Sequence, residues 1–341
     1  MKRVGYLIEK IAELDNLYLA YAKACRGKRT KVEVIKFSKD LSQNLAKMQR
    51  EIIDGEVCVG NYTYFQIRDP KPRTICAASF YERVLHHAIM NVCHPYFDRG
   101  LIYDTYATRP GKGIYSALEK AKKAMIQYRY VVKLDVRKYF DSIQHSVLKM
   151  ELRRIFKDNR LLRIFDSIID SYSVSDGCGL PIGNLTSQYF ANLYLSRIDH
   201  QIKEQFRVKT YVRYMDDMLL FFDDRTEMKS VVRGVETLTK ERGLILKTPL
   251  VKPTNCGISF LGYKLMPHHL LLGRVSKQRF CAKMKNYARF LSFGLWNQQR
   301  YADHITPLLA FVDKASTYRF RRDVMTKVAI GGWLLPRFAW R

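Results

Sequence analysis

Two adjacent acids, Asp216 and Asp217, interrupt an otherwise apolar stretch of the chain. Tyr211 and Val212 precede them, and residues 218–222 (MLLFF) follow. Burying two neighbouring carboxylates is costly unless a cation neutralises them, so the segment favours a metal site at a turn between two strands. Adjacent aspartates also occur as ordinary solvated turn residues, and the pair alone leaves that alternative open.

A third acid, Asp135, ends another apolar segment, residues 130–135 (YVVKLD). Two strands side by side, each delivering a carboxylate at its end, form an oxygen-rich site suited to Mg²⁺. Two such ions about 4 Å apart stabilise the attacking and leaving oxygens of an in-line phosphoryl transfer. We therefore predict that Asp135, Asp216 and Asp217 are catalytic and bind two Mg²⁺ ions, with Mn²⁺ as a substitute.

The elements that must position these acids mix helices and strands without regular alternation. Strands are expected at residues 61–69 and 130–135, at 210–222 as two strands around a tight turn, and at 258–275 as a further pair. Helices are expected over most of 1–53, over 79–93, from about 142, from the loop 177–183 through 196, and over most of the chain after 275. Residues 70–73 (PKPR) predict a rigid, extended, basic connection. This mixture predicts an α+β fold and argues against a doubly wound sheet.

The chain is strongly basic, with 59 Lys and Arg against 32 Asp and Glu and a formal net charge of +27. Such an excess repels itself in the compact state, and phosphate contacts by Lys and Arg make it useful. A nucleic-acid partner is the prediction; a merely basic protein is the alternative. We find no apolar run long enough for a spanning helix and predict no membrane partner.

Cysteine usage and the N-terminal segment bear on the compartment. The seven cysteines are odd in number and none has C-x-x-C spacing, so a disulfide framework or zinc site is not predicted. Charges interrupt the first 14 residues (MKRVGYLIEKIAEL), which have helical spacing and do not resemble a signal peptide. We predict a cytoplasmic protein of a bacterium or of a phage-infected host.

Five segments, in order over about residues 65–265, resemble the motifs of reverse transcriptases. They are Lys71-Pro72-Arg73, Asp135 with 136–143 (VRKYFDSI), 179–188 (GLPIGNLTSQ) running on to Ala191-Asn192, Tyr214-Met215-Asp216-Asp217 as the Y-x-D-D box, and 260–263 (FLGY). The resemblance implies an RNA-directed DNA polymerase with a right-hand fold, in which helices back an antiparallel palm sheet and the thumb is helical. The implied divisions are an N-terminal extension with fingers at 1–125, a palm at 126–268 and a thumb at 269–341.

The resemblance also implies roles for individual residues. The metal-binding set is Asp135, Val136, Asp216 and Asp217. The set that binds the deoxynucleoside triphosphate is Lys71, Arg73, Phe140, Ile182 and Gln188. The template and primer set is Gly183, Ser187, Tyr214, Met215, Leu261 and Gly262. Phe140 would stack under the incoming sugar and exclude a 2′-hydroxyl, which disfavours an RNA-dependent RNA polymerase; the alternative is a core phenylalanine.

Residues 182–188 (IGNLTSQ) point to a subfamily, since the I-G-x-x-x-S-Q form resembles enzymes of diversity-generating retroelements. Such enzymes copy a template-repeat RNA with errors at adenine for mutagenic retrohoming, and they work with a basic accessory protein. Residues 106–113 (YATRPGKG) resemble their fingers loop. We expect Ile182 with Arg73 to loosen the check on the incoming base, unless Ile182 only packs. A group II intron-like, retron-like or phage-defence enzyme and a non-catalytic RNA-binding palm protein are the alternatives.

One departure concerns the lysine that often acts as general acid after the Y-x-D-D box. Neither Lys247 nor Lys252 fits the common spacing, so that role is left unassigned. The basic C-terminal part, with interleaved aromatics, predicts contact with the backbone of an RNA/cDNA hybrid.

Overall fold

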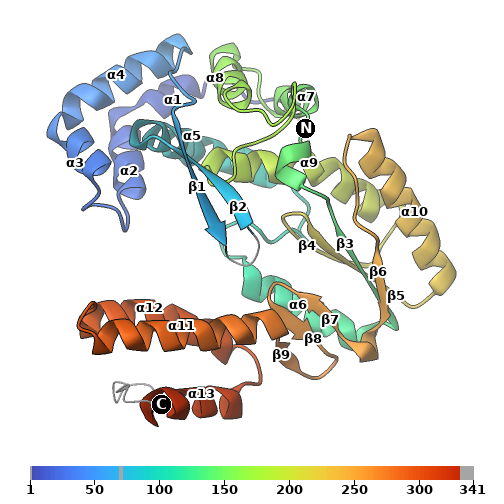
Figure 1. Cartoon of the computed structure of the whole chain (residues 1–341). Coiled ribbons are helices and arrows are strands. Elements are labelled where there is room, and N and C mark those ends of the chain that lie inside the picture. The colour runs from blue at the N-terminus through green and yellow to red at the C-terminus, as the bar shows by residue number, and fades with distance from the viewer. Residues whose placement is uncertain (1, 69–71, 331–341) are drawn as a thin grey trace. The chain divides into compact units, whose positions relative to one another are not determined.

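The computed structural model describes residues 2–68 and 72–330 and has a mixed α+β fold (Figure 1). The α-helices are α1 (Ile8–Ala12), α2 (Leu14–Ala24), α3 (Val32–Lys39), α4 (Leu41–Asp54), α5 (Phe80–Arg99), α6 (Ile114–Gln127), α7 (His145–Ile155), α8 (Asn159–Asp170), α9 (Leu185–His200), α10 (Arg225–Glu241), α11 (Arg274–Ser292), α12 (Gln298–Asp313) and α13 (Tyr318–Ile330). Short helical turns are η1 (Tyr139–Ser142), η2 (Gln201–Gln205) and η3 (Thr254–Cys256).

The strands form three sheets. They are β1 (Tyr62–Arg68), β2 (Pro72–Ala78), β3 (Tyr130–Asp135), β4 (Thr210–Tyr214), β5 (Asp217–Phe222), β6 (Leu250–Pro253), β7 (Ile258–Phe260), β8 (Tyr263–Leu265) and β9 (Leu270–Leu272). Strands β1 and β2 pair with each other, β4-β5-β3-β6 form a four-stranded sheet, and β7-β8-β9 form a three-stranded sheet. The pairs β1–β2, β3–β6, β7–β8 and β8–β9 are antiparallel.

The chain divides into two compact units. The first comprises the chain up to Gly113, Leu134–Met218 and Thr226–Pro249. The second comprises Ile114–Lys133, Leu219–Arg225 and the chain from Leu250. The fingers, palm and thumb divisions expected at 1–125, 126–268 and 269–341 stay a prediction, because the units group residues by contact and not by role in catalysis.

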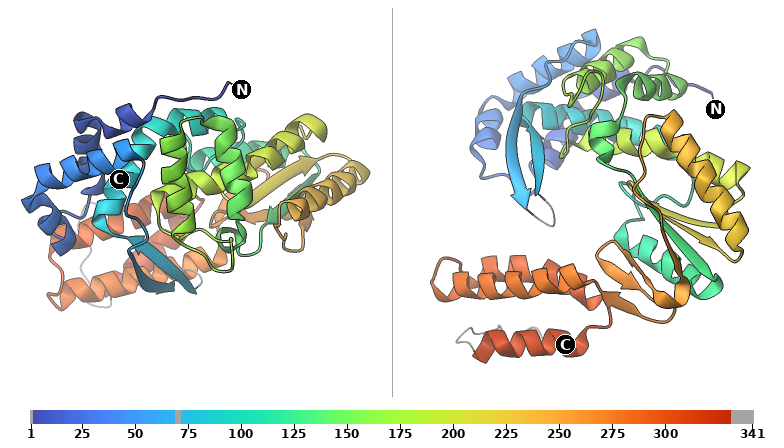
Figure 2. Two further views of the ribbon diagram at one scale, coloured as in Figure 1. Left: turned by 90° about the horizontal axis from the view of Figure 1, so that it is seen from above. Right: turned by 45° about the vertical axis from the view of Figure 1, so that its right-hand side comes forward.

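The core of the first unit is built around α5 and α9. Helix α9 has almost no exposed face, and the Phe97 ring of α5 packs at 5.6 Å from Tyr189 and 6.2 Å from Phe190. Local signals set the helix limits: Ser79 caps α5 by accepting the Glu82 N–H, and Gly55 ends α4 in a left-handed conformation. The two views of Figure 2 show the β1–β2 hairpin extending from these helices as a two-stranded ribbon.

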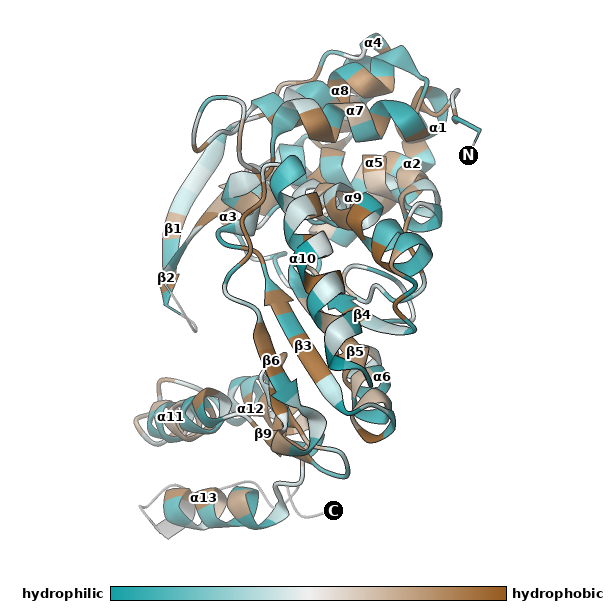
Figure 3. Ribbon diagram, turned by 90° about the vertical axis from the view of Figure 1, so that its right-hand side faces the viewer, coloured by the Kyte–Doolittle hydropathy of each residue, from teal (hydrophilic) through white to brown (hydrophobic). Residues whose placement is uncertain are grey.

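The apolar segments around the acids form the strands that they predict. Strands β4 and β5 are almost entirely buried, and β3 buries Val131, Val132 and Leu134. Figure 3 shows β3 as mainly hydrophobic, whereas α10 carries both colours, in keeping with its buried row Met228, Val231 and Val235. The strands at 130–135 and 210–222 are confirmed.

Three local expectations need correction. The helix expected from about 142 begins at His145, because the short turn η1 occupies Tyr139–Ser142 first. The pair of strands expected at 258–275 is a set of three, because the chain turns again before Leu270–Leu272. The connection expected at 70–73 lies partly outside the described residues, and Pro72 and Arg73 belong to β2.

In the second unit, β8 contacts α6 and the three-stranded sheet precedes a helical segment. The Tyr263 hydroxyl donates to the Phe311 carbonyl at 2.6 Å, and the two rings lie 4.8 Å apart. No helix among residues 2–68 and 72–330 has the length and apolar content needed to cross a membrane.

Candidate active site

The turn between β4 and β5 carries the adjacent acids. Met215 and Asp216 are the two residues between the strands, and Asp217 is the first residue of β5. Met215 has φ 54°, a left-handed conformation that costs free energy for a residue with a side chain. A two-residue turn with positive φ fits the twist of a hairpin, so the strained turn holds the acids at one end of the sheet.

Asp135 reaches the same region because β3 is the neighbour of β5 in the sheet. Burial, together with the nearby carboxylates of Asp135 and Asp217, raises the pKa of Asp216 to about 6, while Lys247 acts in the opposite direction. Burial disfavours the charged form of a carboxyl group, and neighbouring negative charges add to this effect. The structure therefore brings the three predicted acids together.

The donor set fits a divalent cation. Asp135 Oδ1 is buried and has no hydrogen-bond partner among the described residues, so one acceptor at the site is unsatisfied. Within residues 2–68 and 72–330, no group of three or more His, Cys, Asp or Glu side chains is placed so that it could hold a metal ion by itself. An open carboxylate site is what Mg²⁺ uses when water and substrate phosphates complete its octahedron.

Val136 follows Asp135 and has a buried side chain. The only oxygen that a valine offers is its main-chain carbonyl, so a role for Val136 in metal binding is restricted to that atom. The residue forms an antiparallel bridge with Leu246, which places the segment after α10 beside the end of β3.

Lys247 is a residue of the site whose role the sequence left unassigned. Its Nζ lies 2.6 Å from Asp135 Oδ2, and its main-chain N–H donates to the Asp135 carbonyl at 2.8 Å. Lys252 is placed differently, opposite Val131 in the β3–β6 pair. The sequence places Lys247 at the end of a short segment that could be extended. Sequence spacing alone did not show which strand this segment pairs with, so the contact with Asp135 was not predicted.

A buried ion pair joins the β4–β5 hairpin to helix α9. Arg213 of β4 and Asp199 of α9 are both fully buried and lie 2.6 Å apart. Arg213 also donates to Asn192 Oδ1 at 3.0 Å and to the Met215 carbonyl at 2.9 Å. Burial alone would lower the pKa of Arg213, but Asp199 and Tyr211 raise it overall, so the guanidinium stays charged. The pair thereby fixes the strained turn against α9.

The glycine-rich loop before α9 is joined to β2. The Cys76 N–H donates to the Ile182 carbonyl at 2.9 Å, and the Ala78 N–H donates to Asn184 Oδ1 at 3.3 Å. Gly183 has φ 122°, and a Cβ there would lie 2.9 Å from Ile75 Cγ2, so only glycine allows this approach. The structure thus brings half-buried Ile182 to the strand that carries exposed Arg73. Lys71 lies outside the described residues.

Phe140 links the first and second motifs. It is half-buried in η1, and its carbonyl accepts the Leu180 N–H at 2.9 Å. Its ring packs edge-on against the buried ring of Tyr139 at 5.8 Å. The position after Asp135 and beside the glycine-rich loop is compatible with the expected contact to a nucleotide sugar.

Helix α9 begins at Leu185, directly after the loop at 177–183 and its cap Asn184, as expected, and it continues to His200. The side chain of Ser187 is 1% exposed, so the structure does not present it to a template. Gln188 is partly exposed, and its Oε1 accepts from the Thr108 hydroxyl at 3.2 Å.

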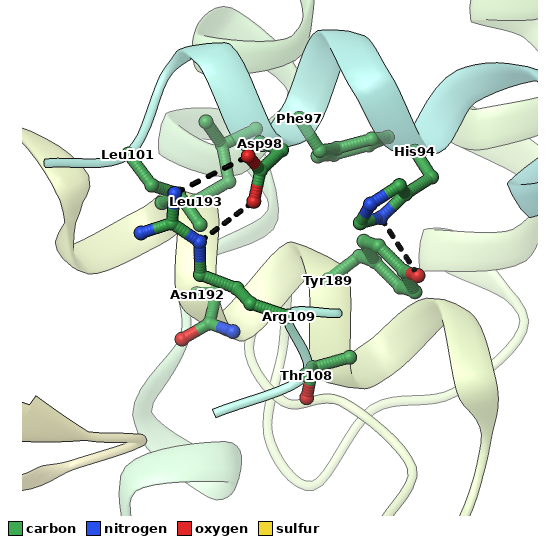
Figure 4. A pocket seen from close by; sticks show the side chains of 9 residues that line it. All are labelled: His94, Phe97, Asp98, Leu101, Thr108, Arg109, Tyr189, Asn192 and Leu193. Atoms are coloured by element: carbon green, nitrogen blue, oxygen red, sulfur yellow. Dashed lines mark hydrogen bonds and ion pairs between the residues drawn. The ribbon is translucent and has the colours of Figure 1, made fainter. Parts of the chain in front are cut away.

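The loop at 106–113 is held beside Gln188 by an arginine. Figure 4 shows Arg109 reaching Asp98 of α5, with Thr108 and Asn192 close by. Arg109 Nε lies 2.6 Å from Asp98 Oδ1, and this contact lowers the pKa of Asp98. Thr108 has φ 56° and is, like Met215, one of the non-glycine residues of this unit in the left-handed conformation. The arginine therefore positions a loop that holds the Gln188 side chain.

The remaining predicted residues, Leu261 and Gly262, lie in the second unit. They form the turn between β7 and β8, with φ 48° and 88°. The Gly262 carbonyl accepts from the Gly273 N–H at 3.0 Å and from the Ser276 hydroxyl at 2.7 Å. The hairpin expected at 260–263 is therefore formed, and its contact with a primer stays a prediction.

Carboxylates at the end of a strand and in a neighbouring hairpin turn are the kind of groups that metal-dependent phosphoryl transfer uses. The family model of the reverse transcriptase (RNA-dependent DNA polymerase) matches residues 67–265, more than half of the chain. The chain therefore belongs to the reverse transcriptase family. Membership implies a divalent metal ion, deoxynucleoside triphosphates and an RNA template.

Curated relatives agree with this membership. Protein YkfC of Escherichia coli is 22% identical over 320 residues, which cover 76% of this chain and 82% of that protein. The putative COX1/OXI3 intron 2 protein of Saccharomyces cerevisiae is 20% identical over 179 residues, covering 50% of this chain and 20% of the yeast protein. The putative COX1/OXI3 intron 1 protein of the same yeast is 18% identical, covering 76% and 39%. The chain thus spans most of the bacterial relative and less than half of each yeast relative.

Two solved telomerases are similar to this chain at 13% identity. The telomerase from Candida albicans with a fragment of telomeric RNA has a TM-score of 0.48, with 78% of this chain and 59% of that chain covered. The apo telomerase from Candida tropicalis has a TM-score of 0.46, with 62% and 55% covered.

Proposed function

We propose that this reverse transcriptase makes cDNA by two-metal nucleotidyl transfer at Asp135, Asp216 and Asp217. When bound, two Mg²⁺ ions supply charge stabilisation for the attacking 3′-hydroxyl and the leaving pyrophosphate. Asp135, Asp216, Asp217 and the Val136 carbonyl hold them, and Mn²⁺ substitutes. The single observation that carries the proposal is geometric: Asp135 ends β3, and the neighbouring strand β5 begins at Asp217, directly after Asp216 in the hairpin turn. A cation at this point would offset both the burial of Asp216 and its repulsion by the other two carboxylates, which together raise its pKa.

The nucleotide is bound and selected by groups around this centre. Lys71 and Arg73 neutralise the triphosphate, and Phe140 packs under the sugar and excludes a 2′-hydroxyl. Ile182 and Gln188 border the nascent base pair. The docking of the loop at Ile182 onto β2 supports this grouping, because it ties the loop to the strand of Arg73.

The template and primer contact a further set of residues in each of the two units. The contacting residues are Gly183, Ser187, Tyr214, Met215, Leu261 and Gly262, with Ser187 acting through its main chain because its side chain is buried. In this proposal residues 1–125 hold the N-terminal extension and fingers, 126–268 the palm and 269–341 the helical thumb. The net charge of +27 favours the RNA/cDNA hybrid as the partner.

We further propose that the enzyme belongs to a diversity-generating retroelement and copies a template-repeat RNA with errors at adenine. The support is the segment 182–188 (IGNLTSQ), in which an apolar residue replaces a polar one beside the base pair. A basic accessory protein and a cytoplasmic location in a bacterium or phage-infected host belong to the same proposal.

A group II intron-like enzyme is the second candidate. The similarity to yeast proteins named for introns favours it. A retron-like or phage-defence enzyme would share its main property, which is copying without selective errors at adenine. A non-catalytic RNA-binding palm protein is disfavoured by the three intact acids.

Sequencing of cDNA made by the purified protein on a defined RNA separates these candidates. The retroelement proposal expects errors concentrated at template adenines, with and without added accessory protein, and fewer of them in Ile182→Gln. Ile182→Leu is the matched control, because it keeps an apolar side chain and is expected to keep the errors. Errors spread evenly over the four template bases would favour the intron-like enzyme, and an absence of any cDNA would favour the non-catalytic protein.

A further inference from the structure

The segment after α10 places a lysine ammonium directly on a catalytic carboxylate. The Arg137 N–H donates to the Ile245 carbonyl at 2.8 Å, and the Lys247 N–H donates to the Asp135 carbonyl at the same distance. The bridge between Val136 and Leu246 lies between these bonds. Three consecutive residues are thus held in register, and Lys247 is fixed opposite Asp135.

The Lys247 ammonium contacts one of the two carboxylate oxygens of Asp135 and leaves the other unsatisfied. Lys247 Nζ lies 2.6 Å from Asp135 Oδ2, whereas Asp135 Oδ1 is buried and has no hydrogen-bond partner among the described residues. A lysine ammonium carries one positive charge and three donors, whereas a divalent ion carries two charges and coordinates more oxygens. A divalent ion would therefore satisfy Asp135 more completely than the Lys247 ammonium does.

The lysine is also able to leave. Its side chain is 44% exposed, and that of Asp135 is 30% exposed, so neither is locked in the core. An open groove beside the segment is lined by Arg137, Glu236, Lys240 and Lys247. Glu236 gives a displaced ammonium an acid in the same groove. Exposed ion pairs of this kind contribute little to stability, so exchange of partners costs little.

We propose that Lys247 is an internal counter-ion that occupies a cation position at Asp135 in the metal-free enzyme and gives it up when a divalent ion binds. The inference rests on the proposed metal site. The ammonium keeps the acids from repelling one another between catalytic cycles, and its displacement couples metal binding to movement of the segment at 245–247.

Competition between lysine and metal is tested on the full-length protein without nucleic acid, with Mn²⁺ as the probe. Electron paramagnetic resonance of free Mn²⁺ gives the affinity. Lys247→Met is expected to bind Mn²⁺ about threefold to fivefold more tightly than wild type, the range given by an exposed ion pair. Lys240→Met is the matched control, because it removes a charge from the same groove without touching Asp135, and it is expected to change the affinity less than twofold. An unchanged or weaker affinity in Lys247→Met overturns the inference.

A second measurement uses the wild-type protein and does not depend on a variant that folds. Amine acylation followed by mass spectrometry reports how accessible each lysine is. Labelling of Lys247 is expected to rise when Mn²⁺ is added, while labelling of Lys240 stays constant. Equal labelling of Lys247 with and without saturating Mn²⁺, or the absence of Mn²⁺ binding, overturns the inference. If both measurements succeed but no cDNA is made on any template, the proposed function fails and the lysine–metal exchange stands.

Discussion

Two aspartates of the first unit each face a basic side chain, and the two pairs are built differently. Asp199 and Arg213 are fully buried, and the guanidinium donates to both oxygens of Asp199 and to Asn192 and Met215. Asp135 contacts the Lys247 side chain through Oδ2, and both side chains are partly exposed. Its Oδ1 has no hydrogen-bond partner in the part of the chain that the structure describes. A completed pair holds the hairpin in place, whereas an incomplete pair leaves coordination capacity for a ligand.

The largest effect, a loss of activity, is expected from a substitution in the incomplete pair of Asp135 and Lys247. Asp135→Asn should reduce primer extension on RNA by about a thousandfold or more, because a metal ligand supports several kcal/mol of charge stabilisation in the transition state. Its stability should change by only about 1 kcal/mol, because the pair is exposed. Steady-state extension and urea unfolding measure the two quantities. Activity within tenfold of wild type would contradict the assignment of Asp135.

The completed pair should show the opposite behaviour. Asp199→Asn leaves the buried charge of Arg213 without its partner and should lower the free energy of unfolding by about 3–5 kcal/mol. Urea unfolding measures this, and Asp135→Asn is the control for loss of a carboxylate elsewhere in the same unit. A loss in Asp199→Asn no larger than that in the control would break the comparison.

A charge-conserving change of the same pair sharpens the comparison. Arg213→Lys keeps the charge but loses the planar fork that reaches Asp199, Asn192 and Met215 together. The expected loss in the free energy of unfolding is about 2 kcal/mol, smaller than that of Asp199→Asn. A loss near zero would show that charge alone, without the hydrogen bonds, holds the hairpin.

The smallest expected effect is an increase in the free energy of unfolding when Asp216 loses its charge. The pKa of Asp216 is raised to about 6, so between about pH 4 and 6 the folded protein holds a proton that the unfolded chain has released. The free energy of unfolding of the metal-free protein therefore falls as the pH rises through this window. Above the window the charge of Asp216 has its full destabilising effect. Asp216→Asn removes the cost and should stabilise the protein by on the order of 1 kcal/mol at pH 7.5.

Urea unfolding in EDTA at pH 4 and pH 7.5 tests this sign. The gain of Asp216→Asn over wild type should be present at pH 7.5 and absent at pH 4. Saturating Mg²⁺ should reduce it at pH 7.5, because the ion stabilises only the protein that keeps the acid. A gain of equal size at both pH values would show that the charge of Asp216 is not its cause.

The sequence predicts the acids and the strands under them because these are local signals. The apolar run before Asp135 and the aromatic flanks of Asp216 specify strands of the lengths observed. The α+β class follows from the irregular mixture of helix-like and strand-like segments along the chain. The short turn η1 was predicted as part of the following helix, and β9 was not separated from the strand pair expected at 258–275. Three or four residues carry too little periodicity to be distinguished from their neighbours.

Contacts between distant segments could not be predicted in the same way. Lys247 is 112 residues from Asp135, and its role depends on pairing of a short extended segment that has no marked sequence pattern. Arg213 did carry a signal, because a charged residue in a buried apolar strand requires a partner, but the choice of Asp199 depends on how α9 packs. Ser187 was expected to contact the template, but it lies in α9, and the packing of that helix in the core buries its side chain.

The most direct test of the account counts metal ions in the working complex. The protein is assembled with an RNA template, a chain-terminated DNA primer and the matching deoxynucleoside triphosphate, and bound Mn²⁺ is titrated by electron paramagnetic resonance. The account predicts two Mn²⁺ ions per protein beyond those bound by nucleotide and nucleic acid alone, and loss of at least one of them in Asp216→Asn. Full Mn²⁺ binding in Asp216→Asn, or no bound Mn²⁺ in the wild-type complex, would contradict it.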